Sequence, residues 1–358
     1  MNMIQIAHRW VGRNQPCFII AELSANHLHD FQRAKNLIAE AKQCGVDAVK
    51  IQTYTPDTLT IDCDNELFQI KHPVWGGQTL YELYGKAYIP WEWHQDLKNY
   101  AEQLGLVFFS TTYDISSANF LEKLNVPVYK IASFELVDLP FLKDIAAKGK
   151  PIILSTGMAT LDEIASAVQT IREQGNEDII LLKCTSAYPA KAEEMNLRGI
   201  PVLSENFNVI VGLSDHSLSN DVTIAAVTLG AKVIEKHFTL SRQDGGPDAS
   251  FSLEPNEMQT LVQSIRNIEK ALKVPEFGPT PEERKNLSFR RSLFVIKDIH
   301  KGERITEEHV RSIRPGYGLD PRYYFNIIGK RVVKDVKRGA PLSFDAIEGG
   351  FLEDKQKD

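Results

Sequence analysis

The chain has 358 residues, of which 43% are apolar and 25% are charged, and its formal net charge at pH 7 is -6. Because it has no excess of Lys and Arg, we do not expect it to bind nucleic acid or an anionic membrane surface. Its length exceeds what a single hydrophobic core usually organises, so we expect one large domain and one small domain.

The first residues lack the basic start and the apolar core of a signal peptide, and no apolar run is long enough to span a bilayer. We therefore expect a cytoplasmic protein without a membrane segment. The four cysteines, Cys17, Cys44, Cys63 and Cys184, form no C-x-x-C pair. We expect them to be small core residues or bystanders, and neither a disulfide framework nor a zinc site.

Eight apolar runs alternate with segments whose apolar residues recur three and four positions apart, as on one face of a helix. The runs cover residues 18–24, 47–54, 106–112, 128–133, 151–157, 179–186, 209–215 and 232–238. Eight such units in this length predict a closed (β/α)₈ TIM barrel rather than an open sheet. No G-x-G-x-x-G follows any of the runs, which removes dinucleotide binding, the main alternative for an open sheet.

One long segment, residues 55–94, interrupts the alternation and holds three of the four tryptophans. Long aromatic loops on the active face of a barrel often cover the substrate, and a plain packing insertion is the alternative. The barrel domain is expected over residues 1–273. Three prolines and a charge cluster predict a linker over residues 274–288, and residues 289–350 predict a small β-rich module, too short to be an enzyme alone.

Polar residues end all of the predicted strands, and in a parallel barrel these ends face one pocket. Hydroxyl groups and two lysines suit a phosphate or a carboxylate, because short donors bind its oxygens and a positive charge offsets its own. Helix capping explains some of the hydroxyls, and we expect Thr160 to cap the helix that follows it. Capping does not explain Lys50 and Lys130, whose burial in a strand is costly unless an anion meets them.

Two histidines, His216 and His237, end two of the runs and are separated by one predicted strand-helix-strand unit. A single histidine would more often be a satisfied core residue, but two at equivalent strand ends favour a shared metal ion acting as a Lewis acid on a carbonyl. Nitrogen and oxygen ligands favour Mn²⁺ or Mg²⁺, with Co²⁺ as a substitute. The lysines also permit a Schiff-base aldolase, in which a lysine attacks a carbonyl.

Several segments together resemble the sialic acid synthase family, and the resemblance covers nearly the whole chain. They are AELSANH (21–27), KIQTYTPDTL (50–59), YKIASFE (129–135), LSTGMAT (154–160), KCTSAYP (183–189), GLSDHS (212–217), EKHFTL (235–240) and GPDASFSLEP (246–255). SLFVIKDIHKGE and RPGYGL resemble the antifreeze-like (SAF) domain of the family. The resemblance implies a barrel enzyme that condenses phosphoenolpyruvate with the open aldehyde form of an acylated amino sugar.

The resemblance also implies roles for individual residues. His216 and His237 would bind the metal and take part in catalysis, and Glu22 and Glu135 would stabilise a cationic C2 or position the water that captures it. Phosphoenolpyruvate would be bound by Lys50, Gln52, Thr111, Lys130, Ser133, Ser155, Ser186 and Ser214. The sugar would be bound by Phe134, Tyr188, Asp248 and Arg314. Family members form homodimers in which the SAF domain covers the partner's barrel, so Arg314 would reach the partner's sugar, although it could be a plain surface arginine.

Local features resemble the pseudaminic acid synthase branch of the family, namely ASFE at 132–135, KCTS before Tyr188, KIQTYTPD and WGGQTLYELY. The sugar of that branch is a 2,4-diacetamido-2,4,6-trideoxy hexose, whose C6 methyl Phe134 would favour by roughly 1–3 kcal/mol. GGPDASFSLEP, however, keeps the GPD and SLEP of sialic acid synthases. N-acetylneuraminate or legionaminate synthesis is therefore the alternative, and a noncatalytic sugar-binding relative is the alternative from another class.

Overall fold

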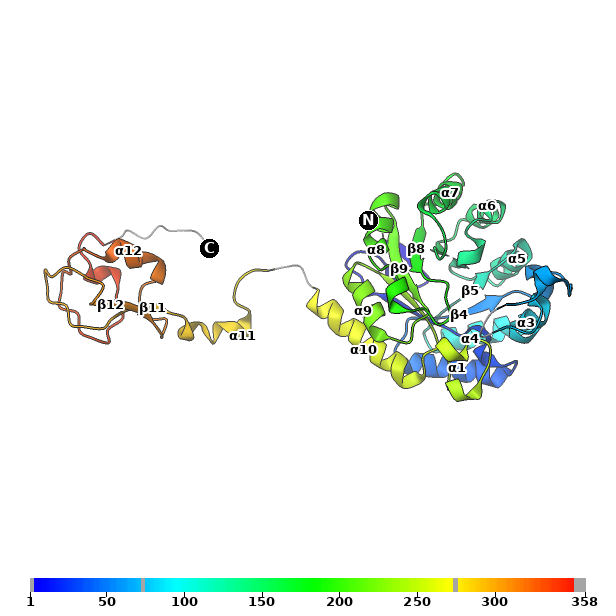
Figure 1. The fold of residues 1–358 in the computed structure, drawn as a ribbon, viewed down its shortest axis with the longest axis horizontal. Coiled ribbons are helices and arrows are strands. Elements are labelled where there is room, and N and C mark those ends of the chain that lie inside the picture. The colour runs from blue at the N-terminus through cyan, green and yellow to red at the C-terminus, as the bar shows by residue number, and fades with distance from the viewer. Residues whose placement is uncertain (1–2, 72–74, 273–275, 351–358) are drawn as a thin grey trace. The chain divides into compact units, whose positions relative to one another are not determined.

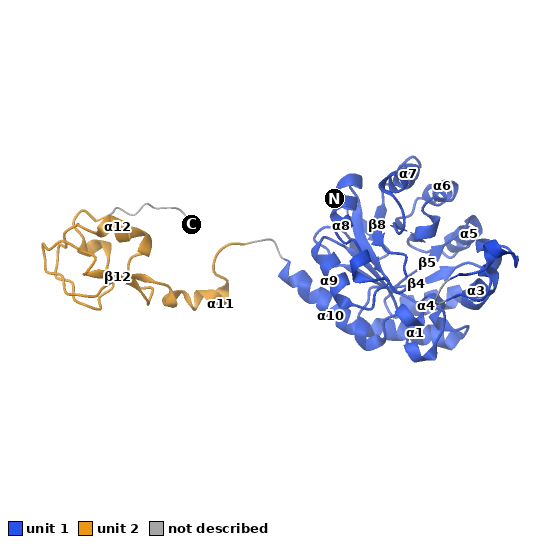
Figure 2. Cartoon of the chain, viewed as in Figure 1, with its two compact units in different colours: residues 1–273 blue, residues 274–358 orange. Residues whose placement is uncertain are grey.

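The computed structural model describes residues 3–71, 75–272 and 276–350. The chain divides into two compact units, Met1–Lys273 and Val274–Asp358 (Figure 2). Each unit has its own cluster of buried apolar side chains, so each has its own hydrophobic core. Among the helices of the described residues, none has the length and apolar character needed to cross a membrane.

Eight parallel strands of the first unit close into a barrel in the order β10-β3-β4-β5-β6-β7-β8-β9 (Figure 1). The strands are β3 (Phe18–Glu22), β4 (Ala48–Thr53), β5 (Val107–Thr112), β6 (Tyr129–Ile131), β7 (Ile152–Ser155), β8 (Ile179–Cys184), β9 (Ile210–Asp215) and β10 (Val233–His237). Each lies inside its predicted run, so the predicted (β/α)₈ barrel is confirmed. The strands are almost wholly buried, because helices cover the outside of the barrel and side chains fill its inside.

Helices surround the barrel and bury one face each (Figure 1). They are α1 (Phe31–Cys44), α4 (His94–Gln103), α5 (Ile115–Lys123), α6 (Leu139–Ala147), α7 (Leu161–Arg172), α8 (Gly199–Phe207), α9 (Asn220–Thr228) and α10 (Pro255–Ala271). The predicted cap of α7 is confirmed, because Thr160 Oγ1 accepts a hydrogen bond from the backbone N–H of Glu163 at 3.3 Å. The Glu163 carboxylate accepts from the backbone N–H of Thr160 at 2.7 Å in return, which completes a capping box.

The segment between β4 and β5 contains four short helical elements, which are α2 (Pro56–Leu59), η2 (Glu66–Phe68), α3 (Leu80–Ala87) and η3 (Trp91–Trp93). A capping box fixes the start of α3, since Thr79 Oγ1 accepts from the N–H of Glu82 at 3.1 Å and Glu82 accepts from the N–H of Thr79 at 2.9 Å. One face of α3 is turned toward the pocket described below.

The barrel begins with an antiparallel hairpin that the sequence analysis did not predict, formed by β1 (Ile4–Ile6) and β2 (Arg9–Val11). Its apolar side chains join the barrel core, and the Arg9 guanidinium lies 2.7 Å from the carboxylate of Asp47. Asp47 precedes β4 and also binds Arg266 at 2.9 Å, so the hairpin packs at the end of the barrel where the strands begin. Two strands of three residues carry too little periodicity to be read from sequence.

The second unit pairs β11 (Ser292–Val295) with β12 (Val310–Ile313) in antiparallel register, and isolated bridges extend the pairing. Its other elements are α11 (Pro281–Arg284), η8 (Leu287–Phe289), η9 (Pro321–Tyr323), α12 (Tyr324–Ile327) and η10 (Phe344–Ala346). The predicted small β-rich module is therefore confirmed. The described part of residues 274–288, expected as a linker, contains the one-turn helix α11 and the start of η8.

Candidate active site

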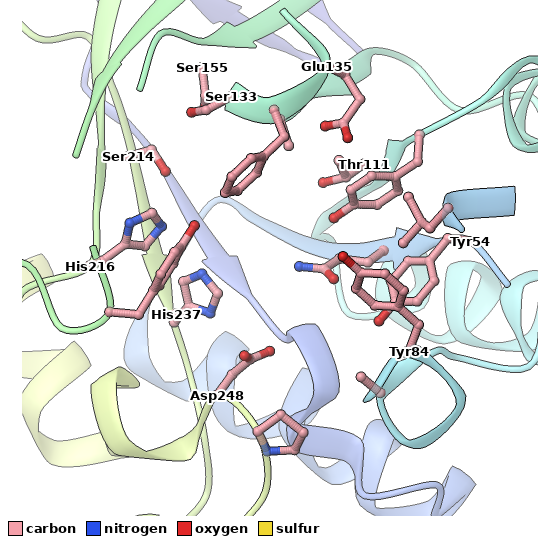
Figure 3. A pocket seen from close by; sticks show the side chains of 18 of the residues that line it. Tyr54, Tyr84, Thr111, Ser133, Glu135, Ser155, Ser214, His216, His237 and Asp248 are labelled. Carbon is pink, nitrogen blue, oxygen red and sulfur yellow. The ribbon is translucent and has the colours of Figure 1, made fainter. Parts of the chain in front are cut away.

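A cavity of about 460 Å³ opens among the C-terminal ends of the barrel strands (Figure 3). Its volume lies in the range of small-molecule sites, roughly 300–1,000 Å³. The predicted site residues that line it are Lys50, Gln52, Thr111, Lys130, Ser133, Phe134, Glu135, Ser155, Tyr188, Ser214, His216, His237 and Asp248. The barrel therefore brings together side chains from seven of its eight strands or from the loops that directly follow them.

Three predicted site residues are not in the cavity wall. Glu22, at the end of β3, is 1% exposed and forms an ion pair with Lys50 directly beneath the pocket. Ser186 and Ser133 both lie against Gly157. Their hydroxyl oxygens would be 2.3 Å (Ser186) and 2.7 Å (Ser133) from a Cβ atom placed on Gly157, so the two serines are close to each other. Arg314 belongs to the second unit.

The two buried lysines have different surroundings. Lys50 donates to Thr111 Oγ1 at 2.7 Å, pairs with Glu22, and lies 3.8 Å from the Glu235 carboxylate. The expectation that burial of Lys50 requires an anion is therefore met within the protein, by Glu22 and Glu235. Lys130 instead donates to Ser155 Oγ at 2.7 Å and to the Ile131 carbonyl at 2.8 Å, and no carboxylate of the described residues is within ion-pair distance.

Burial lowers the pKa of Lys130, and the nearby Glu235 carboxylate acts in the opposite direction. Hydroxyl groups from neighbouring strands surround this lysine. Ser133 Oγ accepts from the backbone N–H of Gly157 at 3.0 Å, and Ser214 Oγ donates to Glu235 at 3.2 Å. The Lys130 site thus combines a buried ammonium that has no ion-pair partner among the described residues with short hydroxyl side chains, which suits a phosphate or a carboxylate.

The two histidines lie side by side, with ring centroids 5.2 Å apart (Figure 3). Nδ1 of His216 donates to the Thr185 carbonyl at 2.9 Å. Nδ1 of His237 lies 3.1 Å from Ser24 Oγ, whose own hydrogen is directed to Glu22. Because each Nδ1 has a partner in the protein, Nε2 is the nitrogen that each ring offers to a metal. Burial, with His216 and Lys50 adding to it, holds the pKa of His237 well below its ordinary value, so His237 is neutral as a metal ligand must be.

No group of three or more His, Cys, Asp and Glu side chains among residues 3–71, 75–272 and 276–350 is arranged to hold a metal ion. A metal bound by the histidine pair would therefore have two ligands from the protein and would fill its other positions with substrate and water. Such an open coordination sphere fits a Lewis acid and does not fit a structural zinc site, which is closed by four protein ligands.

Burial raises the pKa of two carboxyl groups in the wall. The pKa of Glu135 rises to about 7, against the opposing charge of Lys130, and that of Asp248 rises to about 6, against a hydrogen bond from the Ala25 N–H. A third carboxylate, Glu235, lines the pocket with one oxygen that has no hydrogen-bond partner. Sequence reasoning gave Glu235 no role, although it stands two residues before His237 and must face the same side of β10.

Aromatic residues also line the cavity. Tyr188 packs its ring 4.4 Å from that of His216 and 5.3 Å from that of Trp75, measured between centroids. Phe134 lines the pocket at its rim and is 59% exposed. The residues that sequence reasoning missed are Tyr54, Leu59, Ile70, Trp75, Leu80, Leu83, Tyr84, Ala87, Tyr113, Ala132, Cys184, Glu235 and Pro247. All four cysteines are free, and Cys184 lies in the pocket wall, so it is no bystander.

Comparisons with known proteins agree with this arrangement. The model of the NeuB family matches residues 37–276, and that of the SAF domain matches residues 290–348. A pseudaminic acid synthase of Campylobacter jejuni is 46% identical over 325 residues, which are 91% of this chain and 95% of that protein. An N,N'-diacetyllegionaminic acid synthase of Legionella pneumophila is 39% identical over 342 residues, which are 94% of this chain and 96% of that protein. The crystal structure of spore coat polysaccharide biosynthesis protein spsE from Bacillus subtilis has a TM-score of 0.67 and 34% identity, covering 99% of this chain and 100% of that one.

Proposed function

Because the chain belongs to the NeuB family, we propose that it condenses phosphoenolpyruvate with an open-chain 2,4-diacetamido-2,4,6-trideoxy hexose, giving pseudaminic acid and phosphate. The observation that carries this proposal is the juxtaposition, in one pocket, of Lys130 without a carboxylate partner and the His216–His237 pair. The higher identity to the pseudaminic acid synthase than to the legionaminic acid synthase, 46% against 39%, supports the choice of sugar.

Phosphoenolpyruvate binds at the lysine side of the pocket. The ammonium of Lys130 offsets its negative charge, while the hydroxyls of Ser133, Ser155 and Ser214 donate to its oxygens. Lys50, held by Glu22 and Thr111, orients the same group without adding much net charge. The side-chain amide of Gln52 donates to Ser24 Oγ at 3.0 Å. This hydrogen bond holds Gln52 in place between the lysine side and the histidine side of the pocket.

The reaction forms one carbon-carbon bond and breaks one bond to phosphate. C3 of phosphoenolpyruvate attacks the aldehyde carbon of the sugar, whose oxygen takes the electron pair and a proton. Water then adds to the cationic C2 and gives up a proton. Phosphate leaves from C2 with the electron pair of its C–O bond, and the C2 hydroxyl loses its proton to give the ketone. Glu135 and Glu22 are the carboxylates that stabilise the charge at C2 and orient the water.

His216 and His237 are the residues that would hold a divalent ion, which we take to be Mn²⁺ or Mg²⁺, with Co²⁺ as a substitute. When bound there, such an ion would polarise the aldehyde oxygen of the sugar. The hydrogen bonds at both Nδ1 atoms support this assignment, because they orient the rings and fix their tautomers before any ion binds.

The active form in this proposal is a homodimer in which the SAF domain of one copy covers the barrel of the other. Arg314 of the partner copy then reaches the bound sugar. The match of a SAF domain to residues 290–348 supports the presence of the covering domain. We place the reaction in the cytoplasm, where phosphoenolpyruvate is available.

Phosphate release from phosphoenolpyruvate across a panel of acetamido sugars tests this function. We expect the highest kcat/KM with the 2,4-diacetamido-2,4,6-trideoxy hexose. Preference for N-acetylmannosamine or for a legionaminic acid precursor would move the assignment to another branch of the family. Sugar binding without phosphate release from any of the sugars would instead support a noncatalytic role, and a borohydride-trapped lysine adduct would support a Schiff-base aldolase.

A further inference from the structure

Three tyrosines form one wall of the pocket, and no step of the proposed reaction uses them. Tyr54 follows β4, Tyr84 lies on α3 and Tyr113 follows β5. The ring centroid of Tyr54 lies 5.7 Å from that of Tyr84 and 5.3 Å from that of Tyr113. Figure 3 shows Tyr54 and Tyr84 on the opposite side of the pocket from His216 and His237. We call these three residues the tyrosine wall.

Within the part of the chain that the structure describes, none of the three phenol hydroxyls has a hydrogen-bond partner. Their oxygens are not among the buried side-chain oxygens without a partner in the described residues, so the three hydroxyls are open to the cavity that they line. Tyr81, on the same helix as Tyr84 but outside the pocket, donates its hydroxyl to Asp57 at 3.2 Å. Three unpaired hydroxyls gathered in one cavity therefore point to polar groups of a bound molecule.

The tyrosine wall suits an uncharged group. Burial raises the pKa of Tyr54 and Tyr113 well above the ordinary value, with Asp248 adding at Tyr54 and Glu135 adding at Tyr113. The hydroxyls thus stay protonated, and each can donate a hydrogen bond to an uncharged group or accept one from it. In the proposed function the lysines bind phosphoenolpyruvate, so the tyrosine wall lines the part of the pocket that is left for the sugar.

Apolar side chains line the cavity together with the tyrosine wall. Leu80, Leu83, Tyr84 and Ala87 lie at the i, i+3, i+4 and i+7 positions of α3, so one helical face lines the cavity, and Leu59 of α2 adds to it. A hydroxyl-rich sugar would leave polar groups against this face without partners. An acetamido group matches it better, because its carbonyl and N–H meet the phenols while its methyl meets the leucines.

We propose that the tyrosine wall, together with Leu83 and Ala87, is a specificity subsite that binds the acetamido group at C4 of the sugar. This inference rests on the proposed function, which supplies a sugar that carries that group. The subsite distinguishes sugars at C4, far from the aldehyde carbon that reacts, and it therefore acts through binding and positioning.

The test compares two sugars that differ only at C4, one with an acetamido group and one with a hydroxyl, in the wild type and in Tyr54→Phe, Tyr84→Phe and Tyr113→Phe. Each variant should lose about tenfold in kcat/KM for the acetamido sugar, as expected for a lost neutral hydrogen bond in a dry pocket, and about twofold or less for the hydroxyl sugar. Tyr81→Phe is the matched control on α3 and should leave both values unchanged. Thermal melting confirms that every variant is folded.

Equal losses on the two sugars, or no loss on either, would overturn the subsite and leave the proposed function standing, provided that the wild type releases phosphate with the acetamido sugar. Failure of the wild type with that sugar would overturn the proposed function, and the subsite with it. Tyr113→Phe is an independent arm of the test, because Tyr113 follows a barrel strand whereas Tyr84 belongs to the segment inserted between β4 and β5.

Discussion

Glu135 is a carboxyl group whose pKa burial raises from 4.5 to about 7, while Lys130 acts in the opposite direction. Between these pH values the folded chain binds a proton that the unfolded chain releases, so the free energy of unfolding falls as the pH rises. Glu135→Gln removes this titration. We expect it to raise the free energy of unfolding at pH 8 by on the order of 1–3 kcal/mol, with a smaller gain at pH 5, measured by thermal melting.

The same variant should lower kcat for phosphate release by about a hundredfold or more, as expected when a catalytic carboxylate is lost. Glu122→Gln is the control, because Glu122 is an exposed carboxylate that pairs with Lys148 at 2.8 Å outside the pocket. It should leave kcat unchanged and should not raise stability. A melting temperature of Glu135→Gln equal to that of the wild type at pH 8 would show that burial of Glu135 carries no cost.

At the residue scale, sequence reasoning reached half of the residues that line the pocket, because strand ends of a parallel barrel meet at one place and Lys130, His216 and His237 stand at such ends. It did not identify the anion that meets Lys50, since Glu22 lies 28 positions away and is brought opposite Lys50 only by the register of β3 and β4. Tyr84 could not be found either, because no periodicity fixes the path of a long inserted segment relative to the barrel.

Among the elements, β9 and β10 hold the histidine pair in place through a buried ion pair. Lys236 Nζ lies 2.7 Å from the Asp215 carboxylate, both side chains are at most 1% exposed, and Thr223 of α9 donates to the same carboxylate at 2.7 Å. Lys236 and Asp215 are register partners, one residue from His237 and His216 respectively. This pair therefore locks the two strands that carry the proposed metal ligands.

Lys236→Met should lower the free energy of unfolding by about 3–5 kcal/mol, because it leaves a buried carboxylate without its partner. Chemical denaturation measures this change. Lys285→Met, which removes an exposed ion pair to Glu282 at 2.7 Å, is the control and should cost about 1 kcal/mol or less. The double variant Lys236→Met with Asp215→Asn should recover part of the loss, and a loss for Lys236→Met as small as that of the control would contradict the proposed lock.

Removal of divalent ions with a chelator should abolish phosphate release in the wild type, and added Mn²⁺ should restore it. His237→Ala should remain inactive after Mn²⁺ is added, because one of the two imidazoles is missing. His94→Ala is a control for the loss of a buried imidazole, since His94 contacts Thr53 at 2.8 Å outside the pocket and its variant should still respond to Mn²⁺. Full activity of the wild type in excess chelator would contradict the metal assignment.

The strands were predictable from the spacing of apolar residues, and an eightfold strand-helix repeat leaves few alternative topologies. The start of helix α7 was predictable from its capping residue, Thr160. The hairpin β1–β2 was not predictable, since its strands of three residues are stabilised by contacts with Asp47 and the barrel core rather than by a local pattern. Residues 55–94 were expected either to cover the substrate or to pack, and α3 lines the pocket with one face while Glu82 and Lys86 on its other side are exposed.

At the scale of the whole molecule, the proposed swapped homodimer predicts complementation between two inactive chains. In a mixture of Arg314→Ala and His237→Ala, a mixed dimer has one site with an intact barrel and an intact arginine. Random pairing should then restore about a quarter of the wild-type activity. Phosphate release from the refolded mixture, compared with each variant alone, measures this, and no activity above that of the separate variants would contradict the swapped arrangement.

The division into two units was predictable because each has its own core-forming pattern, with strand-helix units before residue 273 and short strands with Gly turns after it. The arrangement of the dimer was not, since apolar periodicity reports burial within a chain and carries no information on a second copy.

The position of α3 outside the eight strand-helix units has a consequence for how this scaffold diversifies. The groups that bind phosphoenolpyruvate stand on barrel strands or directly after them, whereas a large part of the wall facing the sugar belongs to the segment inserted between β4 and β5. Replacing that segment would change which sugar is accepted while the bond-making groups keep their places. Proteins descended from one ancestral barrel would in this way replace this one segment and form other nonulosonic acids.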